Sequence, residues 1–392
     1  MFLANCVYGD HVGGGDVHFF QMAQAAIGAG YQLHFFGGRA LKEHLEKRRI
    51  AGGQTCTDTK KLGAIDMESL SGQFRLLFNY SGRFCRTLRK LSVIQPDDVA
   101  YAVTDYWFDA LPVIFSRARR KMMILGMDAP TFAEIVFRRR PDVPPRRLNS
   151  IYYWVSQSLS LRLFRFCRHK RLLYVHPGMK SRLLRLGYSE SELIFVSNGF
   201  DLEAAENSPA QAKEYDAMWI GRLHRQKGID DLLATLVFLS KRIENFRAVL
   251  AGSLEELNPR LTELGLTEHV HLAGLISEAE KFRLFKASRA FLMPSRYESW
   301  GIVIAESLAC GTPVVAYELD AYRPIFGNLV RYVAPFDVEA FKLAATDEIQ
   351  KSRVGTSGLD PARLVLFKHE NSWQAAGRRF LSAVRELEDS KD

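Results

Sequence analysis

The sequence predicts an α/β protein built from two doubly wound domains, on three observations. The chain has 392 residues, which exceeds one ordinary hydrophobic core and fits two domains of about 200 residues. Short apolar runs alternate with helical patterns along both halves, as in βαβ units. Several apolar runs end in glycine, where a parallel strand passes into a loop at the sheet edge.

The composition is that of a globular protein, with 47% hydrophobic and 25% charged residues. No apolar run approaches the ~20 residues that span a bilayer. The N-terminal stretch Met1–Tyr8 lacks a basic region and leads into a glycine loop, so it predicts a first strand and not a signal peptide. The five cysteines form no CxxC pair. We therefore expect a cytosolic, reduced location.

The first half predicts one α/β domain. Helices are expected at Val17–Ile27 and over most of residues 40–90, with an interruption at Gly52-Gly53. Strands are predicted at Phe2–Val7, Tyr31–Phe36, Val99–Val103, Met122–Leu125, Leu172–His176 and Leu193–Val196. The Gly13-Gly14-Gly15 run is not a GxGxxG fingerprint, and a tight turn explains it as well as a ligand loop does.

Two aspartates of this half directly follow predicted strands. Asp105 comes after Val99–Val103, and Asp128 comes after Met122–Leu125. Residues just past the carboxyl ends of parallel strands face the ligand crevice, which makes both site candidates. A helix N-cap is the alternative for each.

The second half repeats the alternation after a polar linker at Glu203–Glu214. Strands are predicted at Tyr215–Ile220, Arg247–Ala251, Val270–Leu272, Ala290–Met293, Val314–Ala316 and Val330–Val333. Helices are predicted at Ile229–Arg242, Asn258–Leu264, Glu278–Lys286 and Glu370–Leu387. The expected domains are residues 1–205 and 206–370, followed by a terminal helical segment at 371–392.

The most informative stretch places two carboxylates, Glu298 and Glu306, around the start of a helix at Gly301. An anion at a helix start meets free backbone N–H groups and the positive end of the helix dipole. A carboxylate on either side of that anion would accept hydrogen bonds from sugar hydroxyls. The pattern indicates a nucleotide-sugar site.

A second loop carries two cations, Arg222 and Lys227, between Gly221 and Gly228 at the end of a predicted strand. Fixed cations there would stabilise the charge on a departing nucleoside diphosphate. A solvated surface loop is the alternative. The sequence has no HxxxH, HExxH or DxD motif, so we expect no metal site.

The charge is uneven along the chain. Residues 1–200 carry 29 Lys and Arg against 16 Asp and Glu, or +13, and the remainder carries 24 against 28, or −4. Basic and aromatic residues alternate over residues 117–171, which favours contact with an anionic membrane surface. A solvated basic face and phosphate-binding arginines are alternatives. No recognised motif supports nucleic-acid binding.

These motifs resemble those of the retaining glycosyltransferases of family four, which have the GT-B architecture of two Rossmann-like domains facing across a cleft. The similarity is specific over residues 170–390 and holds only in outline over the first 150. It rests on the E-x7-E motif from Glu298 to Glu306 with the following Ser307–Ala316, on Gly221-Arg222-Leu223 with Lys227-Gly228, on Ser197–Asp201, on Gly13-Gly14-Gly15 and on Asn371-Ser372-Trp373.

The resemblance implies a role for each matched residue. Arg222 and Lys227 would stabilise the leaving diphosphate, Glu298 would contact the donor sugar, and Glu306 would bind the ribose. Further donor-binding positions would be Gly14, Gly15, Gly221, Gly252, Ser253, Leu275, Ser299, Trp300, Gly301 and Ile302. The family retains the anomeric configuration and uses neither a divalent metal nor another cofactor. The segment 371–392 would pack back toward the first domain.

One residue departs from the family pattern. Many members have a histidine where this chain has Asp128. Asp128 would then stabilise the reacting carbon or orient the acceptor, or His11 or His18 would stand in for the histidine.

We therefore predict a retaining, metal-independent hexosyltransferase of polysaccharide biosynthesis. It would use a nucleotide-diphosphate sugar and a glycan or lipid-linked acceptor, in the cytoplasm and peripherally on the inner face of the membrane. A nucleotide-sugar epimerase and a catalytically idle nucleotide-sugar-binding protein are the alternatives; no pyridoxal-lysine motif supports a phosphorylase. The donor base, the sugar and the acceptor stay open.

Overall fold

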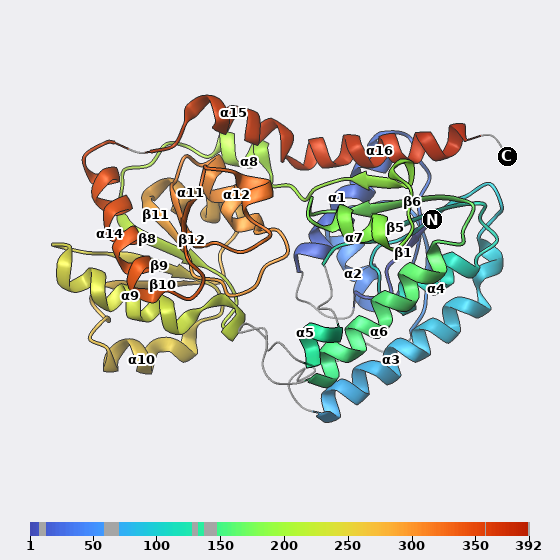
Figure 1. The fold of residues 1–392 in the computed structure, drawn as a ribbon, viewed down its shortest axis with the longest axis horizontal. Helices are drawn as coiled ribbons and strands as arrows, with labels where there is room; N and C mark the ends of the chain where they lie inside the picture. The colour runs from blue at the N-terminus through green and yellow to red at the C-terminus, as the bar shows by residue number, and fades with distance from the viewer. Residues whose placement is uncertain (8–12, 59–69, 128–131, 137–146, 357, 391–392) are drawn as a thin grey trace. The chain divides into compact units, whose positions relative to one another are not determined.

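The computed structural model of the protein describes residues 1–390 except 8–12, 59–69, 128–131, 137–146 and 357 (Figure 1). The chain divides into two compact units. The first contains the described residues of 1–198 and 374–390, and the second contains residues 199–373. The unit boundaries thus follow residues 198 and 373, whereas the sequence places domain boundaries after residues 205 and 370.

The first unit is built on a seven-stranded parallel sheet with the order β3-β2-β1-β4-β5-β6-β7. Its strands are β1 (Phe2–Leu3), β2 (His34–Gly37), β3 (Gly53–Cys56), β4 (Val99–Ala102), β5 (Arg120–Leu125), β6 (His169–Tyr174) and β7 (Leu193–Phe195). From β1 the chain builds the sheet outward in one direction through β2 and β3, and then in the other from β4. This is a doubly wound arrangement.

The helices of the first unit cover this sheet. They are α1 (Gly14–Gly28), α2 (Arg39–Lys47), α3 (Leu70–Arg89), α4 (Trp107–Phe115), α5 (Phe132–Val136), α6 (Arg147–Phe164) and α7 (Met179–Arg185), with short turns η1 (Leu91–Val93) and η2 (Glu190–Glu192). The terminal helix α16 (Trp373–Asp389) adds Phe380, whose ring lies 6.2 Å from Phe2 and 5.3 Å from Tyr101. An aromatic cluster therefore anchors α16 on β1 and β4.

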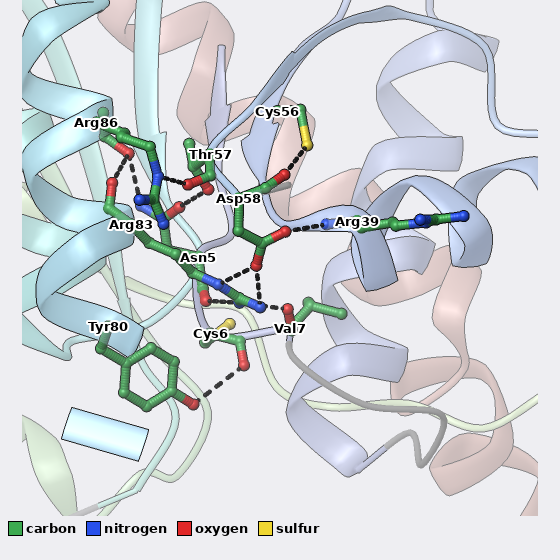
Figure 2. A network of polar contacts seen from close by, with 11 residues as sticks. Asn5, Cys6, Val7, Arg39, Cys56, Thr57, Asp58, Tyr80, Arg83 and Arg86 are labelled. Carbon is green, nitrogen blue, oxygen red and sulfur yellow. Dashed lines mark hydrogen bonds and ion pairs between the residues drawn. The ribbon is translucent and has the colours of Figure 1, made fainter. Parts of the chain in front are cut away.

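A buried ion pair supports the segment that follows β1, as Figure 2 shows. The guanidinium of Arg83 on α3 donates to Asp58 Oδ2 at 2.7 Å through Nε, and to the carbonyls of Asn5 and Val7 at 2.6 and 2.7 Å through Nη1. The other oxygen of Asp58 accepts from the backbone N–H of Arg39 at 2.8 Å. One arginine thus satisfies carbonyls that a strand of only two residues leaves without ladder partners.

The second unit contains a six-stranded parallel sheet with the order β10-β9-β8-β11-β12-β13. Its strands are β8 (Tyr215–Ile220), β9 (Ala248–Ala251), β10 (Val270–Gly274), β11 (Ser288–Met293), β12 (Val314–Tyr317) and β13 (Arg331–Val333). The helices are α8 (Leu202–Asn207), α9 (Ile229–Arg242), α10 (Asn258–Glu263), α11 (Glu278–Ala287), α12 (Ile302–Ala309), α13 (Arg323–Phe326), α14 (Val338–Arg353) and α15 (Pro361–Glu370), with turns η3 (Arg225–Lys227) and η4 (Glu255–Leu257).

Both faces of this sheet are buried under helices. Trp219 of β8 lies in one core cluster, together with Leu232 and Leu236 of α9. Its neighbour Met218 lies in the opposite cluster, with Phe285 of α11 and Leu308 of α12. Successive strand residues point to opposite faces, so each strand contributes to both cores. The two parallel sheets confirm the predicted fold class of two Rossmann-like domains.

The structure also corrects several element predictions. The first strand ends at Leu3 and not at Val7, and residues 40–90 contain the edge strand β3 between α2 and α3. The predicted linker includes α8, and α6, α14 and α15 are helices that the sequence patterns did not single out. The edge strand was missed because its four residues are mostly exposed, which leaves no apolar run to detect.

Candidate active site

The candidate site lies at the carboxyl edge of the sheet in the second unit. The chain leaves β8 through α9 toward β9, and it leaves β11 through α12 toward β12, on the other side. The loops after two adjacent strands therefore diverge between β8 and β11. Such a topological switch point is where open parallel sheets bind ligands.

The loops after β8 and β11 are held against each other. Gly228 has a φ of 67°, and a Cβ at this position would lie 1.9 Å from the carbonyl oxygen of Pro294. The backbone N–H of Arg296 donates to the carbonyl of Gln226 at 2.8 Å, and the Gln226 amide donates to the carbonyl of Tyr297 at 2.8 Å. Only glycine permits this approach, which brings the two predicted motifs together.

Lys227 and Glu298 meet across these two loops. Lys227 Nζ lies 2.5 Å from Glu298 Oε1, and the two side chains are 17% and 13% exposed. The predicted partner Arg222 is exposed and forms no hydrogen bond or ion pair with the residues that the structure describes. Of the four predicted catalytic charges, the structure therefore pairs Lys227 with Glu298 and leaves Arg222 in solvent, while Asp128 lies outside the described residues.

The helix start between the two glutamates is formed as the sequence predicts. Gly301 has a φ of 86° and is the N-cap of α12, which begins at Ile302. Trp300 is buried, with its ring 5.6 Å from that of Phe326, while Ser299 is half-buried. The first N–H groups of a helix have no acceptor within the helix, so this end of α12 offers donors to an anion.

Glu306 lies inside α12 and is buried. Its Oε1 accepts a hydrogen bond from Lys281 Nζ of α11 at 2.6 Å, and Lys281 also contacts Glu278 at 2.8 Å. Among the described residues, no partner exists for Glu306 Oε2. Burial raises the pKa of the Glu306 carboxyl, and Lys281 opposes that shift. Glu306 thus presents one buried acceptor that no described residue uses.

Four predicted positions, Gly221, Gly252, Ser253 and Leu275, lie at the ends of β8, β9 and β10. The N–H of Gly221 donates to the carbonyl of Ala251 at 3.1 Å, and the N–H of Gly252 donates to the carbonyl of Gly274 at 2.8 Å. Beyond them, Leu275 is exposed, and Ser253 Oγ donates to Glu255 at 3.2 Å. The ends of β8, β9 and β10 therefore form one continuous edge.

The remaining predicted residues belong to the first unit or are not described. Gly14 and Gly15 open α1, where the N–H of the N-cap Gly13 donates to Asp16 at 2.8 Å. Asp128 and His11 lie outside the described residues. His18 is buried with Nδ1 2.9 Å from Asn198 Oδ1, and burial lowers its pKa to about 4. His18 is therefore neutral near pH 7.

Asp105 is neither a helix N-cap nor exposed. Tyr106 is the N-cap of α4, and the Asp105 carboxylate accepts from Gln157 at 2.8 Å and from the Tyr153 hydroxyl at 3.4 Å. Burial raises its pKa to about 6. Gln157 also donates to the carbonyl of Met127 at 2.8 Å, so it links the ends of β4 and β5.

Lys281 is the site residue that the sequence patterns missed. It lies 25 positions before Glu306, and no motif connects the two. No group of three or more His, Cys, Asp or Glu suited to a metal ion occurs in the part of the chain that the structure describes. In the same part, no helix is long and apolar enough to cross a membrane.

Comparison with known proteins relates most of the second unit to a family of glycosyltransferases. Residues 202–352 match the family model Glycosyl transferases group 1. The O-antigen chain mannosyltransferase B of Escherichia coli is 24% identical over 82% of this chain and 86% of its own length. The phosphatidyl-myo-inositol mannosyltransferase of Mycobacterium leprae is 29% identical over 34% of this chain and 38% of its own length. Several of the matched curated relatives thus align over about two fifths of their own length.

Solved structures resemble the whole chain. The sucrose-phosphate synthase of Thermosynechococcus elongatus has a TM-score of 0.71 at 17% identity and covers 100% of this chain and 99% of its own. Anabaena Alr3699/HepE in complex with UDP and glucose has a TM-score of 0.66 at 15% identity and covers 98% of each chain. These neighbours confirm the GT-B type of fold. Residues 202–352 are similar to the glycosyl transferases group 1 family.

Proposed function

We propose that this chain is a retaining, metal-independent glycosyltransferase that uses a nucleotide-diphosphate sugar. The observation that carries the proposal is the Lys227–Glu298 contact of 2.5 Å at the switch point of a group 1 glycosyltransferase domain. A cation and a carboxylate side by side suit a donor whose phosphate needs positive charge and whose sugar needs hydrogen-bond acceptors.

Each charged group would have one task on the donor. Lys227 and Arg222 would hold the diphosphate together. The Arg222 side chain is exposed and would rotate toward the diphosphate. The N–H groups of Trp300, Gly301 and Ile302 would bind a phosphate at the start of α12. Glu298 would then accept hydrogen bonds from the sugar, and Glu306 Oε2 from the ribose hydroxyls.

Lys281 supports the role of Glu306 in this proposal. Its ammonium occupies Oε1 and keeps negative charge on the carboxyl, which leaves Oε2 to accept from the ligand. The edge formed by Gly221, Gly252 and Leu275 would border the base.

The chemical step follows from where charge develops. As the bond from the anomeric carbon to the diphosphate breaks, the leaving oxygen gains negative charge that Lys227 and Arg222 stabilise. The acceptor hydroxyl attacks the anomeric carbon from the same face and passes its proton to the departing diphosphate oxygen, which retains configuration without a lasting covalent intermediate. The residues that would orient the acceptor, including Asp128, belong to this proposal as well.

The relatives suggest where to look for substrates. The matched relatives include proteins named as mannosyltransferases, one of them acting on phosphatidyl-myo-inositol, and a structural neighbour binds UDP and glucose. We propose a glycan or lipid-linked acceptor, a cytoplasmic location and peripheral contact with an anionic membrane.

A nucleotide-sugar screen tests the proposal. Mannosyl and UDP-linked donors are added to the full chain, and a ligand at 100 times its dissociation constant should add about 2.7 kcal/mol of stability. Transfer to glycan and lipid acceptors is then measured with the best donor, and the product's anomeric configuration is determined by NMR. Glu298→Ala should abolish most transfer, whereas Lys351→Ala, in an exposed ion pair of the same unit, should not. Equal transfer by wild type and Glu298→Ala would refute the assignment.

A further inference from the structure

Helix α3 exposes an apolar stripe to solvent. Phe74 is 69% exposed and Phe78 is 83% exposed, and Leu77 and Leu88 lie in the same stripe at helical spacing. The opposite side of the helix is buried and contributes Arg83 to the ion pair with Asp58. A helix that buries its polar arginine and exposes phenylalanine reverses the usual arrangement in water.

Helix α6 adds a second stripe. Tyr152, Val155 and Leu159 are exposed along it, and Phe166 just beyond its end is 73% exposed. Trp107 of α4 joins the two helices, because its ring lies 4.9 Å from Phe84 of α3 and its Nε1 donates to the Tyr152 hydroxyl at 2.8 Å. We define the α3–α6 surface as Phe74, Leu77, Phe78, Leu88, Tyr152, Val155, Leu159 and Phe166.

The charge carried by α3, by α6 and by the residues that directly follow them is of one sign. The sequence contains no Asp or Glu at residues 70–96 or 143–189. Arg75 and Arg89 of α3 are exposed, and so are Arg162 and Arg168. None of these four forms an ion pair with the residues that the structure describes. Cations without an ion-pair partner in the described part of the chain therefore flank the apolar stripes.

Much of the basic stretch 117–171 is used within the first unit. Arg120 donates to the carbonyls of Leu387 and Glu388, Lys170 pairs with Glu192 at 2.6 Å, and Arg171 pairs with Glu386 at 3.3 Å. Arg138–Arg140 and Arg146 lie outside the described residues. Fewer cations of residues 117–171 therefore remain for contact with a membrane than the charge alone predicts. Helix α3, which lies outside residues 117–171, contributes further exposed residues.

We propose that the α3–α6 surface docks on an anionic lipid bilayer, with α3 lying in the plane of the interface. Aromatic and aliphatic side chains would enter the boundary between headgroups and acyl chains, and the flanking arginines would meet the headgroups. At 20 residues, α3 is about 30 Å long, as an interfacial helix is. A nucleic acid would need the cations and not the exposed aliphatic side chains.

This inference rests on the proposed function and assigns a surface to its membrane contact, because a bilayer would present a lipid-linked acceptor to the enzyme. The binding surface and the donor site share no residue. Donor binding and membrane binding can therefore be measured separately, and each can fail without the other.

The test is sedimentation of the full chain with vesicles. Vesicles of phosphatidylglycerol and phosphatidylcholine should bind the wild type, and vesicles of phosphatidylcholine alone should bind much less. Phe74→Ser with Phe78→Ser should lower partitioning by at least about tenfold. Val365→Ser with Leu366→Ser, which removes exposed apolar groups from α15 of the second unit, should leave it unchanged. Arg75→Gln with Arg89→Gln should flatten the salt dependence.

Three results would overturn the proposal. These are no binding of the wild type to anionic vesicles, equal binding by the Phe74→Ser, Phe78→Ser variant, and a solution dimer that this variant dissociates. The last would show that a second copy covers the surface. Thermal stabilisation by the best nucleotide-sugar, measured on the same variants, should stay at the wild-type value. If the protein binds vesicles but no nucleotide-sugar, the proposed function is refuted and the membrane-binding proposal is not.

Discussion

Each compact unit buries an ion pair, and the two pairs use their carboxylate oxygens differently. In the first unit, both oxygens of Asp58 accept hydrogen bonds, one from Arg39 N–H and one from Arg83 (Figure 2). In the second unit, Lys281 occupies one oxygen of Glu306, and no described residue donates to the other. Both carboxylate oxygens of Asp58 therefore have a donor in the protein, whereas Glu306 Oε2 has none among the described residues.

We propose that this difference separates a structural charge from one placed for a ligand. A buried acceptor without a donor costs about 1–3 kcal/mol of stability, so it is retained where a ligand supplies the donor. Asp58 has no carboxylate oxygen without a donor, and Arg83 also donates hydrogen bonds to the carbonyls of Asn5 and Val7. We expect changes at the first pair to alter stability and changes at the second to alter binding.

The largest expected effect is on the stability of the first unit. Arg83→Met leaves the Asp58 carboxylate buried without its cation, which should lower the free energy of unfolding by about 3–5 kcal/mol. Urea unfolding measures this loss. Asp58→Asn combined with Arg83→Met should recover part of it, because the uncompensated charge is gone. A loss below about 1 kcal/mol for the single variant would mean that the pair is not structural.

The next effect is on transfer. Lys227→Ala should reduce the rate of sugar transfer by about 10²–10³-fold, because the leaving diphosphate loses a fixed cation. The free energy of unfolding should change little, since the Lys227–Glu298 pair lies at the loop edge and is partly exposed. Steady-state kinetics beside urea unfolding separates the two quantities. If Lys227→Ala loses stability but keeps its activity, then Lys227 has a structural role, as proposed for Arg83, and not a catalytic one.

A smaller effect is expected in the pH dependence of nucleotide binding. Burial raises the pKa of Glu306, and the ribose hydroxyls need its charged form, so affinity should weaken as pH falls toward that pKa. Lys281 opposes the shift, while Glu278, Asp201 and Cys310 are the other titratable groups coupled to this carboxyl. Lys281→Met should therefore move the loss of affinity to higher pH. If Lys281→Met lowers nucleotide affinity by the same factor at every pH, Lys281 has only a structural role.

The smallest effect is expected for the outer partner of Lys281. The Glu278 side chain is 74% exposed, so its contact with Lys281 is largely screened by water. Glu278→Gln should change nucleotide affinity by less than about twofold. Calorimetric titration of this variant beside Lys281→Met shows whether Lys281 acts through Glu306. An effect as large as that of Lys281→Met would point to Glu278 instead.

Sequence patterns were sufficient for the fold and for part of the site. The alternation of apolar strands and helices predicts both sheets, and the glycines at Gly228 and Gly301 mark turns that the structure confirms. Lys281 and Arg83 could not be predicted, because each pairs with a residue 25 positions away on another element. Such pairs are made by packing and leave no periodicity in the sequence. The roles predicted for all the site residues, Arg222 and Asp128 included, stay predictions.

The most direct test of the central claim is a calorimetric titration of the full chain with UDP and GDP and their 2′-deoxy forms. The proposed role of Glu306 predicts that the wild type binds one nucleotide and prefers its ribose form by about tenfold or more, because a hydrogen bond to a charged group is lost in the deoxy form. Glu306→Gln should bind both forms with similar, weaker affinity. A wild type without ribose preference, or a Glu306→Gln variant that keeps it, would contradict the assignment of Glu306 Oε2 to the donor.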